Sequence, residues 1–251
     1  MLYLVGIGLN PKQLTLEAQE ILKNSDQIFL ENYTSQYSQG NITQLENLIG
    51  KKFQIIGRKG VEEQFESALL SAKKNNISLM IFGNALTATT HLQVLLDAKE
   101  KGIKYKIIPG ISITNTIAES GLDEYKFGRT VTICYHTQNF KPESFYDQIK
   151  NNQKIGLHTL CLLDIKKDET PERLMNCIEA INVLNSIETS RNEKNNFEYV
   201  GLIAMGSENQ KIIIGEKNIL RDKEITNLFP QSLIILGKLN EKEEEGLNLN
   251  K

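Results

Sequence analysis

The chain has 251 residues, of which 40% are hydrophobic and 24% charged, as in an ordinary globular protein. Its formal net charge of −2 and its isoelectric point near 6.0 exclude the broad positive field that gathers nucleic acid or anionic membrane. No apolar run approaches the roughly 20 residues that a membrane-spanning helix needs, and the first residues lack the order of a signal peptide. We therefore expect a cytoplasmic protein with neither nucleic-acid nor membrane partners.

Cysteine and histidine do not form the pattern of a metal site. Cys134, Cys161 and Cys177 are widely spaced among apolar neighbours, which is typical of buried, reduced thiols. The histidines at positions 91, 136 and 158 share no ligand spacing, so we expect no zinc site. Reduced thiols also agree with a cytoplasmic location.

The first 110 residues alternate strand and helix patterns. The predicted strands are Leu2–Gly8, Gln27–Glu31, Phe53–Gly57, Ile77–Gly83 and Tyr105–Pro109. Helices are predicted over 15–22, 61–74 and 92–101, because apolar residues recur there at helical spacing. This alternation with short connections predicts a doubly wound, mostly parallel sheet in an N-terminal domain.

From about residue 128, apolar runs follow one another with fewer helices between them. The predicted strands are Val131–Tyr135, Leu157–Ile165, Tyr199–Ala204, Lys211–Gly215 and Ser232–Gly237, the third and fourth joined as a hairpin. The other predicted segments are a helix over 171–187, a loop over 185–196 and a frayed, charged tail over 241–251. The expected fold is α/β with two domains, 1–110 and 128–240, joined by an interdomain segment at 111–127. The second domain should have a mixed or antiparallel sheet.

The first predicted strand ends in a glycine turn, Gly6-Ile7-Gly8, which suggests a nucleotide-type ligand. A dinucleotide fingerprint would need a third glycine where this chain has Pro11. The chain also has no GxxxxGK[ST] loop for a polyphosphate. These gaps count against an NAD-dependent oxidoreductase, which we keep only as an alternative.

Two other strand ends are richer in polar groups. The stretches 83–91 and 109–115 combine glycine turns with hydroxyl and amide side chains and contain no Lys or Arg. Ligands of an open α/β sheet collect beyond the carboxyl ends of its strands. A neutral rim of this kind suits S-adenosylmethionine, which has an adenine, a ribose and a zwitterionic tail but no phosphate. The same hydroxyl groups can also serve as helix N-caps.

Several stretches resemble the diphthine synthases, which belong to the tetrapyrrole-methylase-like group of S-adenosylmethionine-dependent methyltransferases. In order along the chain they are MLYLVGIGL, FLENYTS, ATTH, YKFGRTVTI, KPESFYDQI, LHTLCLLDIK and MGSENQKIIIGE. The likeness keeps one register from Met1 to about Gly237. The stretch 141–166 is more similar to the eukaryotic members, the diphthine methyl ester synthases.

The resemblance implies a bilobed fold, usually homodimeric, that holds the cofactor between its two domains and releases S-adenosylhomocysteine. It implies that the protein substrate is elongation factor 2, at the histidine that carries an aminocarboxypropyl group. Methylation of its amine is expected, and in eukaryotic-type members also of its carboxylate. The cofactor-binding positions that carry over are Leu9, Thr87, Ser112, Ile113, Leu163 and Met205.

Three positions depart from the family pattern near the cofactor. Asn84 stands where the family usually has an aspartate, and Gln231 stands where it usually has a histidine; both can still hydrogen-bond the cofactor. The loop 109–112 reads Pro-Gly-Ile-Ser, where eukaryotic relatives have Asn-Ala before the serine. These departures leave open a catalytically silent relative that only recognises elongation factor 2. A sibling methylase acting on a small tetrapyrrole is a further alternative.

Methyl transfer from a sulfonium depends mainly on holding nucleophile, methyl group and sulfur in line, so we expect no covalent nucleophile or triad and assign no catalytic residue. Glu31 and Asp164 are candidates for steering a cationic acceptor, although carboxylates at these positions can equally be surface or capping groups. Tyr33 either closes over the substrate or simply packs in the core.

Overall fold

The computed structural model describes residues 1–250, whose contacts divide into two compact units. Unit 1 consists of residues 1–114 and 166–172, and unit 2 of residues 115–165 and the described residues from 173 onward. The short segment 166–172 therefore joins unit 1, although it lies inside the range expected for the second domain. Two side-chain contacts attach it there: Arg58 Nε to Asp168 Oδ2 at 2.7 Å, and Lys167 Nζ to Asn32 Oδ1 at 3.0 Å.

Unit 1 contains the doubly wound parallel sheet that the sequence predicts. Its strands are β1 (Leu2–Gly6), β2 (Gln27–Glu31), β3 (Gln54–Ile56), β4 (Ile77–Ile81) and β5 (Tyr105–Ile108). They pair in the order β3-β2-β4-β1-β5, and every pairing is parallel. The central strands β1 and β4 are almost entirely buried, as expected for a sheet that is covered on both faces.

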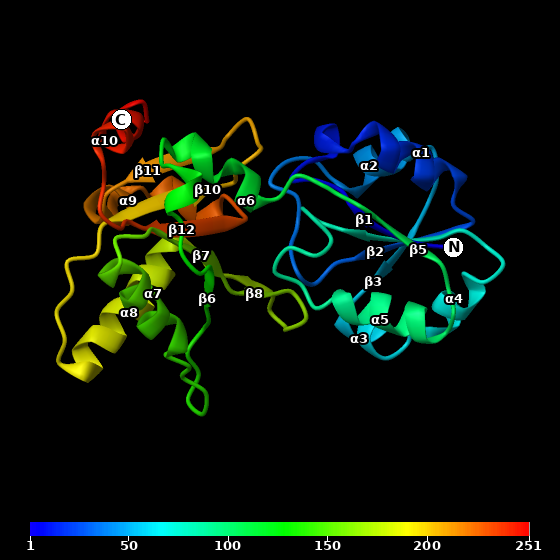
Figure 1. Ribbon diagram of the computed structural model, residues 1–251, viewed down its shortest axis with the longest axis horizontal. Coiled ribbons are helices and arrows are strands. Elements are labelled where there is room, and N and C mark those ends of the chain that lie inside the picture. Colours follow the sequence, from blue (N-terminus) through cyan, green and yellow to red (C-terminus); the bar gives the residue numbers. More distant parts are fainter. Residues whose placement is uncertain (251) are drawn as a thin grey trace. The chain divides into compact units, whose positions relative to one another are not determined.

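The helices of unit 1 form a layer on each side of this sheet (Figure 1). One layer is α1 (Leu16–Asn24) and α2 (Ile42–Ile49), preceded by the short η1 (Pro11–Gln13); the other is α3 (Arg58–Glu62), α4 (Glu66–Ser71) and α5 (Leu92–Glu100). The single helix predicted over 61–74 is wrong. The chain leaves helical geometry at Glu63, and Phe65 turns inward to pack edge-on against Phe29 at 5.4 Å between ring centroids.

Unit 2 contains a mixed sheet, as predicted. Its strands are β6 (Val131–Ile133), β7 (Thr159–Leu163), β10 (Tyr199–Ile203), β11 (Lys211–Ile214) and β12 (Gln231–Ile235), in the order β11-β10-β12-β7-β6. Only β6 and β7 pair in parallel; the predicted β10–β11 hairpin is confirmed. The short strands β8 (Ile165–Lys166) and β9 (Arg173–Leu174) form a separate pair.

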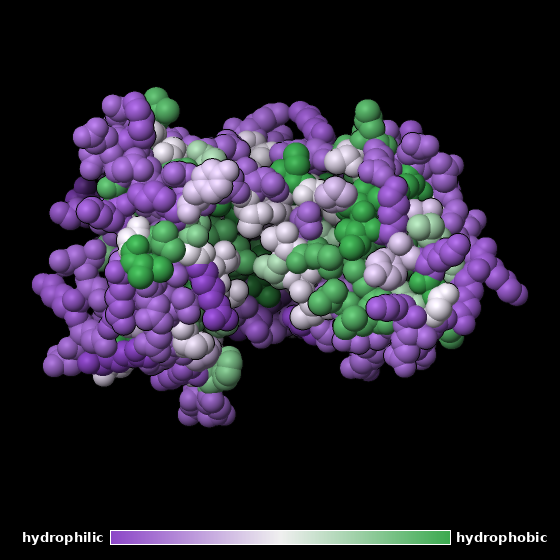
Figure 2. Space-filling model, viewed as in Figure 1, coloured by the Kyte–Doolittle hydropathy of each residue, from purple (hydrophilic) through white to green (hydrophobic). Residues whose placement is uncertain are grey.

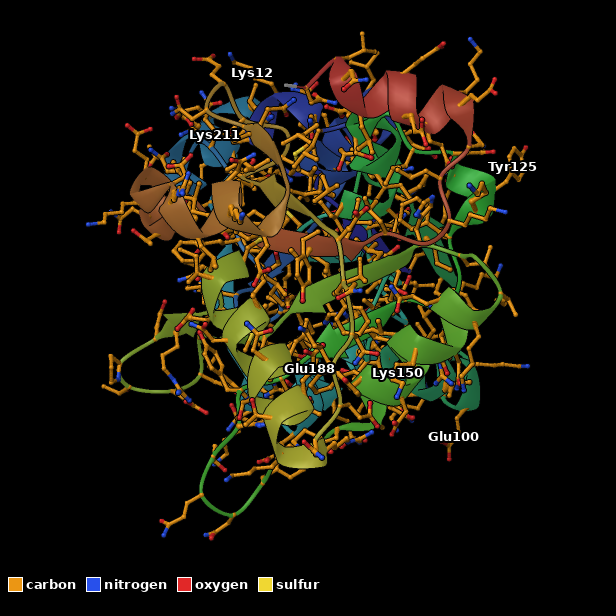
Figure 3. The ribbon with its side chains drawn as sticks, turned by 90° about the vertical axis from the view of Figure 1, so that its left-hand side faces the viewer. Lys12, Glu100, Tyr125, Lys150, Glu188 and Lys211 are labelled. Carbon is orange, nitrogen blue, oxygen red and sulfur yellow. The ribbon has the colours of Figure 1, made fainter. Side chains whose placement is uncertain are left out.

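The two long helices of unit 2, α7 (Ser144–Lys154) and α8 (Cys177–Arg191), bury their apolar faces in one core with the sheet. Lys150 on α7 and Glu188 on α8 mark the outer sides of these helices (Figure 3). The shorter elements are α6 (Ile113–Thr116), η2 (Ile117–Ser120), η3 (Glu124–Lys126), α9 (Glu216–Arg221), η4 (Lys223–Asn227) and α10 (Glu241–Asn248).

Helix α8 begins at Cys177, six residues later than the sequence predicts. Asn176 and Glu179 form a capping box that fixes the start, so the predicted start at Pro171 is wrong. At the other end, the loop predicted from residue 185 is wrong as far as Arg191, because Ile187 is buried and Arg191 is bonded to carboxylates of the α7 region. The helix stops at Asn192, whose φ of 52° is left-handed.

The frayed tail predicted over 241–251 is also wrong for most of its length. Residues 241–248 form α10, which Asn240 starts with a capping box to Glu243. Glu243 and Leu247 are buried on the inner side of this helix. Lys251, the last residue of the predicted tail, lies outside the described residues. No helix within residues 1–250 has the length and hydropathy to cross a membrane.

Candidate functional site

Five of the predicted cofactor-binding residues lie in unit 1, in the loops that follow three adjacent strands. Leu9 follows β1, Asn84 and Thr87 follow β4, and Ser112 and Ile113 follow β5. Because β4, β1 and β5 are parallel neighbours, the loops after them meet at the carboxyl edge of the sheet. That edge is where open α/β sheets bind ligands.

Glycines allow these three loops to approach one another closely. A Cβ on Gly110 would lie 2.2 Å from the Gly83 carbonyl oxygen, and one on Gly6 would lie 2.7 Å from the same atom. Gly8 and Gly83 exchange two backbone hydrogen bonds, of 3.1 and 2.9 Å, with left-handed φ values of 76° and 71°. The glycine turn that ends β1 therefore serves close backbone packing against the loops after β4 and β5.

The polar groups of the cluster are neutral. The Asn84 amide donates to the Gly110 carbonyl at 3.3 Å and accepts from the Leu86 N–H at 3.2 Å, so it joins the loops after β4 and β5. The buried Ser112 hydroxyl lies 2.7 Å from Thr114 Oγ1. The loops 82–91 and 109–115 contain no Lys or Arg. This set of donors and acceptors fits a ligand with adenine, ribose and amino-acid groups, and it does not suit a polyphosphate.

The other three predicted cofactor-binding residues lie at one end of the strands in the sheet of unit 2. Leu163 ends β7, Met205 follows β10, and Gln231 begins β12. Gln231 is opposite Ile203 in the β10–β12 ladder, and Ser232 is opposite Leu162 in the β12–β7 ladder. The antiparallel register thus brings the end of β10, the start of β12 and the end of β7 together.

Gln231 uses its side chain within the protein. Its amide oxygen accepts from the Cys177 N–H at 2.8 Å, and its amide nitrogen donates to the carbonyls of Ile225 at 2.6 Å and Leu228 at 2.8 Å. These bonds connect the start of β12 with α8 and η4. The contact of Gln231 with adenine or ribose stays a prediction, and it would require one of these bonds to be shared.

A buried polar cluster lies beside the proposed cofactor loops of unit 1. Glu31 ends β2, the neighbour of β4, and its carboxylate accepts from Thr34 Oγ1 at 2.5 Å through Oε1. The other oxygen, Oε2, lies 3.6 Å from His91 Nε2, which is too long for a hydrogen bond. Tyr33 lies beside them, with its ring centroid 6.2 Å from that of His91. None of these three residues is more than 2% exposed.

Burial displaces the titration of both ionisable partners. It raises the pKa of Glu31 to about 7, against the opposing effects of Thr34, Lys167 and Arg58. It lowers the pKa of His91 to about 4, only partly opposed by the nearby Ala85 backbone. At neutral pH the imidazole is therefore neutral, and the carboxyl group is close to its own titration midpoint.

Charged side chains cover this cluster. The Arg58 guanidinium carbon lies 4.6 Å from the centroid of the Tyr33 ring, and Asp168 holds Arg58 from the segment 166–172. Lys167, from the same segment, donates to Asn32. The sequence singled out Glu31 and Tyr33 for the acceptor, but it did not single out His91, whose place beside Glu31 depends on the pairing of β2 with β4.

Asp164, the other carboxylate considered for steering, follows β7 in unit 2. Its Oδ2 accepts from the Tyr135 N–H at 3.0 Å, and its own N–H donates to the Ile133 carbonyl at 3.1 Å. These bonds fasten the ends of β6 and β7 to each other. A capping role, one of the two alternatives that the sequence left open, is therefore present.

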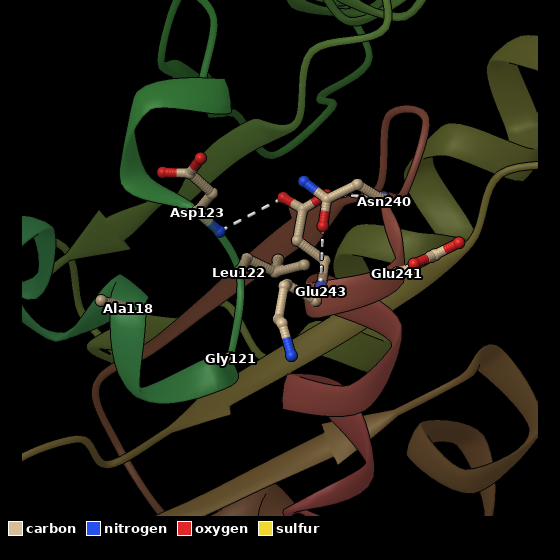
Figure 4. Close-up of a pocket in the computed structure, with 8 residues that line it drawn as sticks. Ala118, Gly121, Leu122, Asp123, Asn240, Glu241 and Glu243 are labelled. Atoms are coloured by element: carbon tan, nitrogen blue, oxygen red, sulfur yellow. Dashed lines mark hydrogen bonds between the residues drawn. The ribbon is translucent and has the colours of Figure 1, made fainter.

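A second buried charge cluster, which no sequence pattern indicated, lies in unit 2. Glu243 of α10 accepts hydrogen bonds from His158 Nε2 at 2.8 Å, from Lys126 Nζ and from the Asp123 N–H at 3.2 Å. It lines a groove of about 700 Å³ with residues of the 118–123 and 240–243 segments (Figure 4). Both oxygens of this carboxylate have hydrogen-bond partners within unit 2, so we infer that the cluster stabilises the fold. In the described part of the chain, no group of three or more His, Cys, Asp or Glu residues could hold a metal ion.

Comparison with known proteins gives consistent matches over the chain. Residues 1–216 match the family model of tetrapyrrole (corrin/porphyrin) methylases. The diphthine synthase of Methanocaldococcus jannaschii is 34% identical over 251 residues, covering 98% of this chain and 97% of that protein. The diphthine methyl ester synthase of Homo sapiens is 33% identical over 272 residues, covering 99% of this chain and 94% of that protein.

The solved structures agree with the sequence matches. The crystal structure of a putative diphthine synthase from Entamoeba histolytica superposes with a TM-score of 0.88 at 33% identity, covering 100% of this chain and 98% of that one. A second crystal structure, of a diphthine synthase, has a TM-score of 0.86 at 28% identity over 99% of this chain and 95% of that one.

Proposed function

Since the chain belongs to the diphthine synthases, within the tetrapyrrole methylase family, we propose that it methylates the aminocarboxypropyl-modified histidine of elongation factor 2. The family is one of S-adenosylmethionine-dependent methyltransferases, and this chain is such an enzyme. The acceptor is the amine of that side chain, and in a second stage its carboxylate. Full-length identity of 33–36% to diphthine synthases from archaea and eukaryotes supports this substrate over a small tetrapyrrole.

The neutral loop cluster at the carboxyl edge of the unit 1 sheet is the observation that carries the proposal. Bound there, S-adenosylmethionine would supply a methyl group that is already activated for transfer. The residues proposed to hold it are, in unit 1, Leu9, Asn84, Thr87, Ser112 and Ile113, and in unit 2, Leu163, Met205 and Gln231. Asn84 keeps hydrogen-bonding capacity at a position where the family pattern usually has an aspartate, which supports a competent rather than a silent site.

We further propose a homodimer that works in the cytoplasm. The edge strand β5 exposes Tyr105 and Ile107, and α5 exposes Leu92 and Leu96; each of these side chains is 39–56% exposed. Figure 2 shows apolar side chains gathered over this part of unit 1. Burial of such a patch is a common source of subunit association. Ile107→Glu should convert a dimer to a monomer in analytical ultracentrifugation, whereas Ile155→Glu, at an exposed apolar position of unit 2, should not.

Mass spectrometry of the modified histidine peptide tests the activity. Purified protein is incubated with S-adenosylmethionine and elongation factor 2 that carries the aminocarboxypropyl group. Successive methyl increments support the proposal, and their final number separates transfer to the amine alone from transfer that includes the ester. No increment, beside an active diphthine synthase as positive control, would instead favour a silent binding relative.

A further inference from the structure

We propose that Glu31, together with Tyr33 and His91, accepts the proton that the substrate amine loses during methyl transfer. This inference rests on the proposed function, since it assigns a role within that reaction. It goes beyond cofactor binding, because none of the three residues is among those proposed to hold the cofactor.

The first argument is the pattern of unpaired atoms. Within residues 1–250, the buried side-chain nitrogen and oxygen atoms that lack a hydrogen bond of good geometry are Glu31 Oε2, Tyr33 Oη and both ring nitrogens of His91. Thr90 lies near Tyr33, and the Ala85 backbone lies near His91, closely enough to influence their pKa values, but neither completes such a bond. An unpartnered buried polar atom is costly, and a native structure rarely retains one without a reason. Here all four atoms belong to three neighbouring side chains. Such a concentration is expected where the missing partner is a substrate or a transferred proton.

The second argument is the position of the cluster relative to the proposed cofactor loops. The loop that follows β4, residues 82–91, carries Asn84 and Thr87 and ends with His91, immediately before α5. Thr89 Oγ1 donates to the Ala85 carbonyl at 2.8 Å and so braces this loop internally. Glu31 ends β2, which pairs directly with β4, so it lies at the same carboxyl edge of the sheet.

The third argument is chemical. In the transfer, the amine nitrogen forms a bond to the methyl carbon while both electrons of the broken carbon–sulfur bond stay on sulfur. Glu31 receives the proton that the nitrogen loses, which frees the lone pair for the next methyl group. A carboxylate oxygen, a phenol oxygen and a neutral imidazole nitrogen can all accept a hydrogen bond, and a primary ammonium has three N–H groups to donate.

The charged groups around the cluster suit a base that works near neutral pH. Arg58 faces the Glu31 carboxyl group from α3, and Lys167 faces it from the segment 166–172. His91, just before α5, lies near Oε2 of Glu31, and Thr34 donates to Oε1. Burial outweighs the two cations, so the pKa of Glu31 rises to about 7. A general base is most effective when its pKa lies near the working pH.

The burial of Glu31 does not prevent this role, because a proton can pass through an intervening hydroxyl group or one water. Tyr33 carries the hydroxyl, and its ring is covered by Arg58, whose side chain is 44% exposed. Arg58 is held by the partly exposed carboxylates of Asp168 and Glu62. We therefore assign Glu31 as the final acceptor and Tyr33 as the group through which the proton reaches it.

The decisive variant is Glu31→Gln, which keeps the shape and the acceptor for Thr34 but cannot take a proton. At saturating cofactor and pH 7.5, single-turnover methyl transfer should slow by about 10²–10⁴-fold, the usual contribution of a general base. The limb of the wild-type pH–rate profile centred near pH 7 should disappear, while calorimetric affinity for S-adenosylhomocysteine stays within twofold. Tyr33→Phe should slow transfer but keep that limb. Glu66→Gln, an exposed carboxylate on α4, is the matched control and should behave as wild type.

A second readout needs neither cofactor nor substrate. Carbon-13 NMR of the Glu31 carboxyl carbon in the free protein should give a midpoint near pH 7, and the signal should be missing in Glu31→Gln. A midpoint near 4.5 would overturn the inference, and so would a Glu31→Gln rate within twofold of wild type. If the wild-type protein transfers no methyl group at all, the proposed function is wrong, and so is this inference, which rests on it. If wild type is active and only the Glu31→Gln result disagrees, the proton acceptor alone is wrong.

Discussion

The Glu31 carboxylate and the His91 imidazole lie 3.6 Å apart in the interior of unit 1, and neither side chain is accessible to solvent. Their residues are 60 positions apart in the sequence, and the pairing of β2 with β4 brings them together. Burial keeps the pair largely uncharged from about pH 4 to pH 7, because it raises the pKa of the acid and lowers that of the base. This state has consequences for stability as well as for the reaction.

Glu31→Gln should stabilise the protein, and more so at high pH. The raised pKa of Glu31 means that its carboxyl group favours the folded state only while protonated, so wild-type stability falls as the pH rises from about 4.5 through about 7. The shift corresponds to roughly 3 kcal/mol at pH 8. Urea unfolding should show this gain for the variant at pH 8 and only a small part of it at pH 5. An equal difference at both pH values would contradict the assignment.

Glu243→Gln should act in the opposite direction in unit 2. Burial alone would raise the pKa of Glu243, but hydrogen bonds from Lys126, His158 and the Asn240 and Asp123 backbone outweigh it and lower the pKa to about 2. The carboxylate therefore contributes stability above about pH 4.5 that is lost as the pH falls towards 2.

We expect Glu243→Gln to lower the free energy of unfolding by about 2–3 kcal/mol at pH 7, with a smaller loss at pH 3. Hydrogen exchange should show the α10 amides opening more often in the variant. Glu245→Gln, an exposed position on the same helix, is the control. Equal protection of α10 in both variants would show that Glu243 does not hold this helix.

Gly110→Ala should disrupt the loop cluster, because its Cβ would lie 2.2 Å from the Gly83 carbonyl oxygen. The loops after β4 and β5 would have to separate, at a cost of about 3 kcal/mol or more in stability. Calorimetry should also show weaker binding of S-adenosylhomocysteine. Gly57→Ala is the matched control, since nothing lies within 4 Å of its Cβ position. Wild-type stability in Gly110→Ala would mean that the loops can shift freely.

Asn84→Ala and Ser112→Ala should each weaken cofactor binding by about 1–3 kcal/mol, the cost of leaving a buried polar group without its partner. That range is about fivefold to 150-fold in the dissociation constant for S-adenosylhomocysteine. Asn24→Ala, at an exposed amide on α1, should leave the constant unchanged. Unchanged affinity in both site variants would remove these two residues from the proposed cofactor site.

Gln231→Leu separates the two roles open to that residue. Loss of its three bonds to backbone groups of Cys177, Ile225 and Leu228 should lower the free energy of unfolding by about 2–4 kcal/mol. If the side chain also contacts the cofactor, affinity for S-adenosylhomocysteine will fall in the folded variant. Calorimetry at low temperature measures this separately from stability.

The sequence alone determined the alternation of strands and helices in residues 1–110, the β10–β11 hairpin and the family. These depend on local periodicity, on turn residues and on long matching stretches, all of which can be read along the chain. It also indicated correctly that the strand ends after β1, β4 and β5 carry glycines and neutral polar groups, because these residues lie next to one another in the sequence.

Only the tertiary structure decided the length of α8, the existence of α10 and the partners of the buried charges. Residues 241–248 look like a solvated tail because Glu243 is one acid among several. Its burial is favourable because Lys126, His158 and the Asp123 N–H, all distant in the sequence, donate to its carboxylate. The neighbourhood of Glu31 and His91 likewise depends on strand order. Local sequence cannot encode such pairs, since the free energy that places them comes from contacts between segments far apart in the chain.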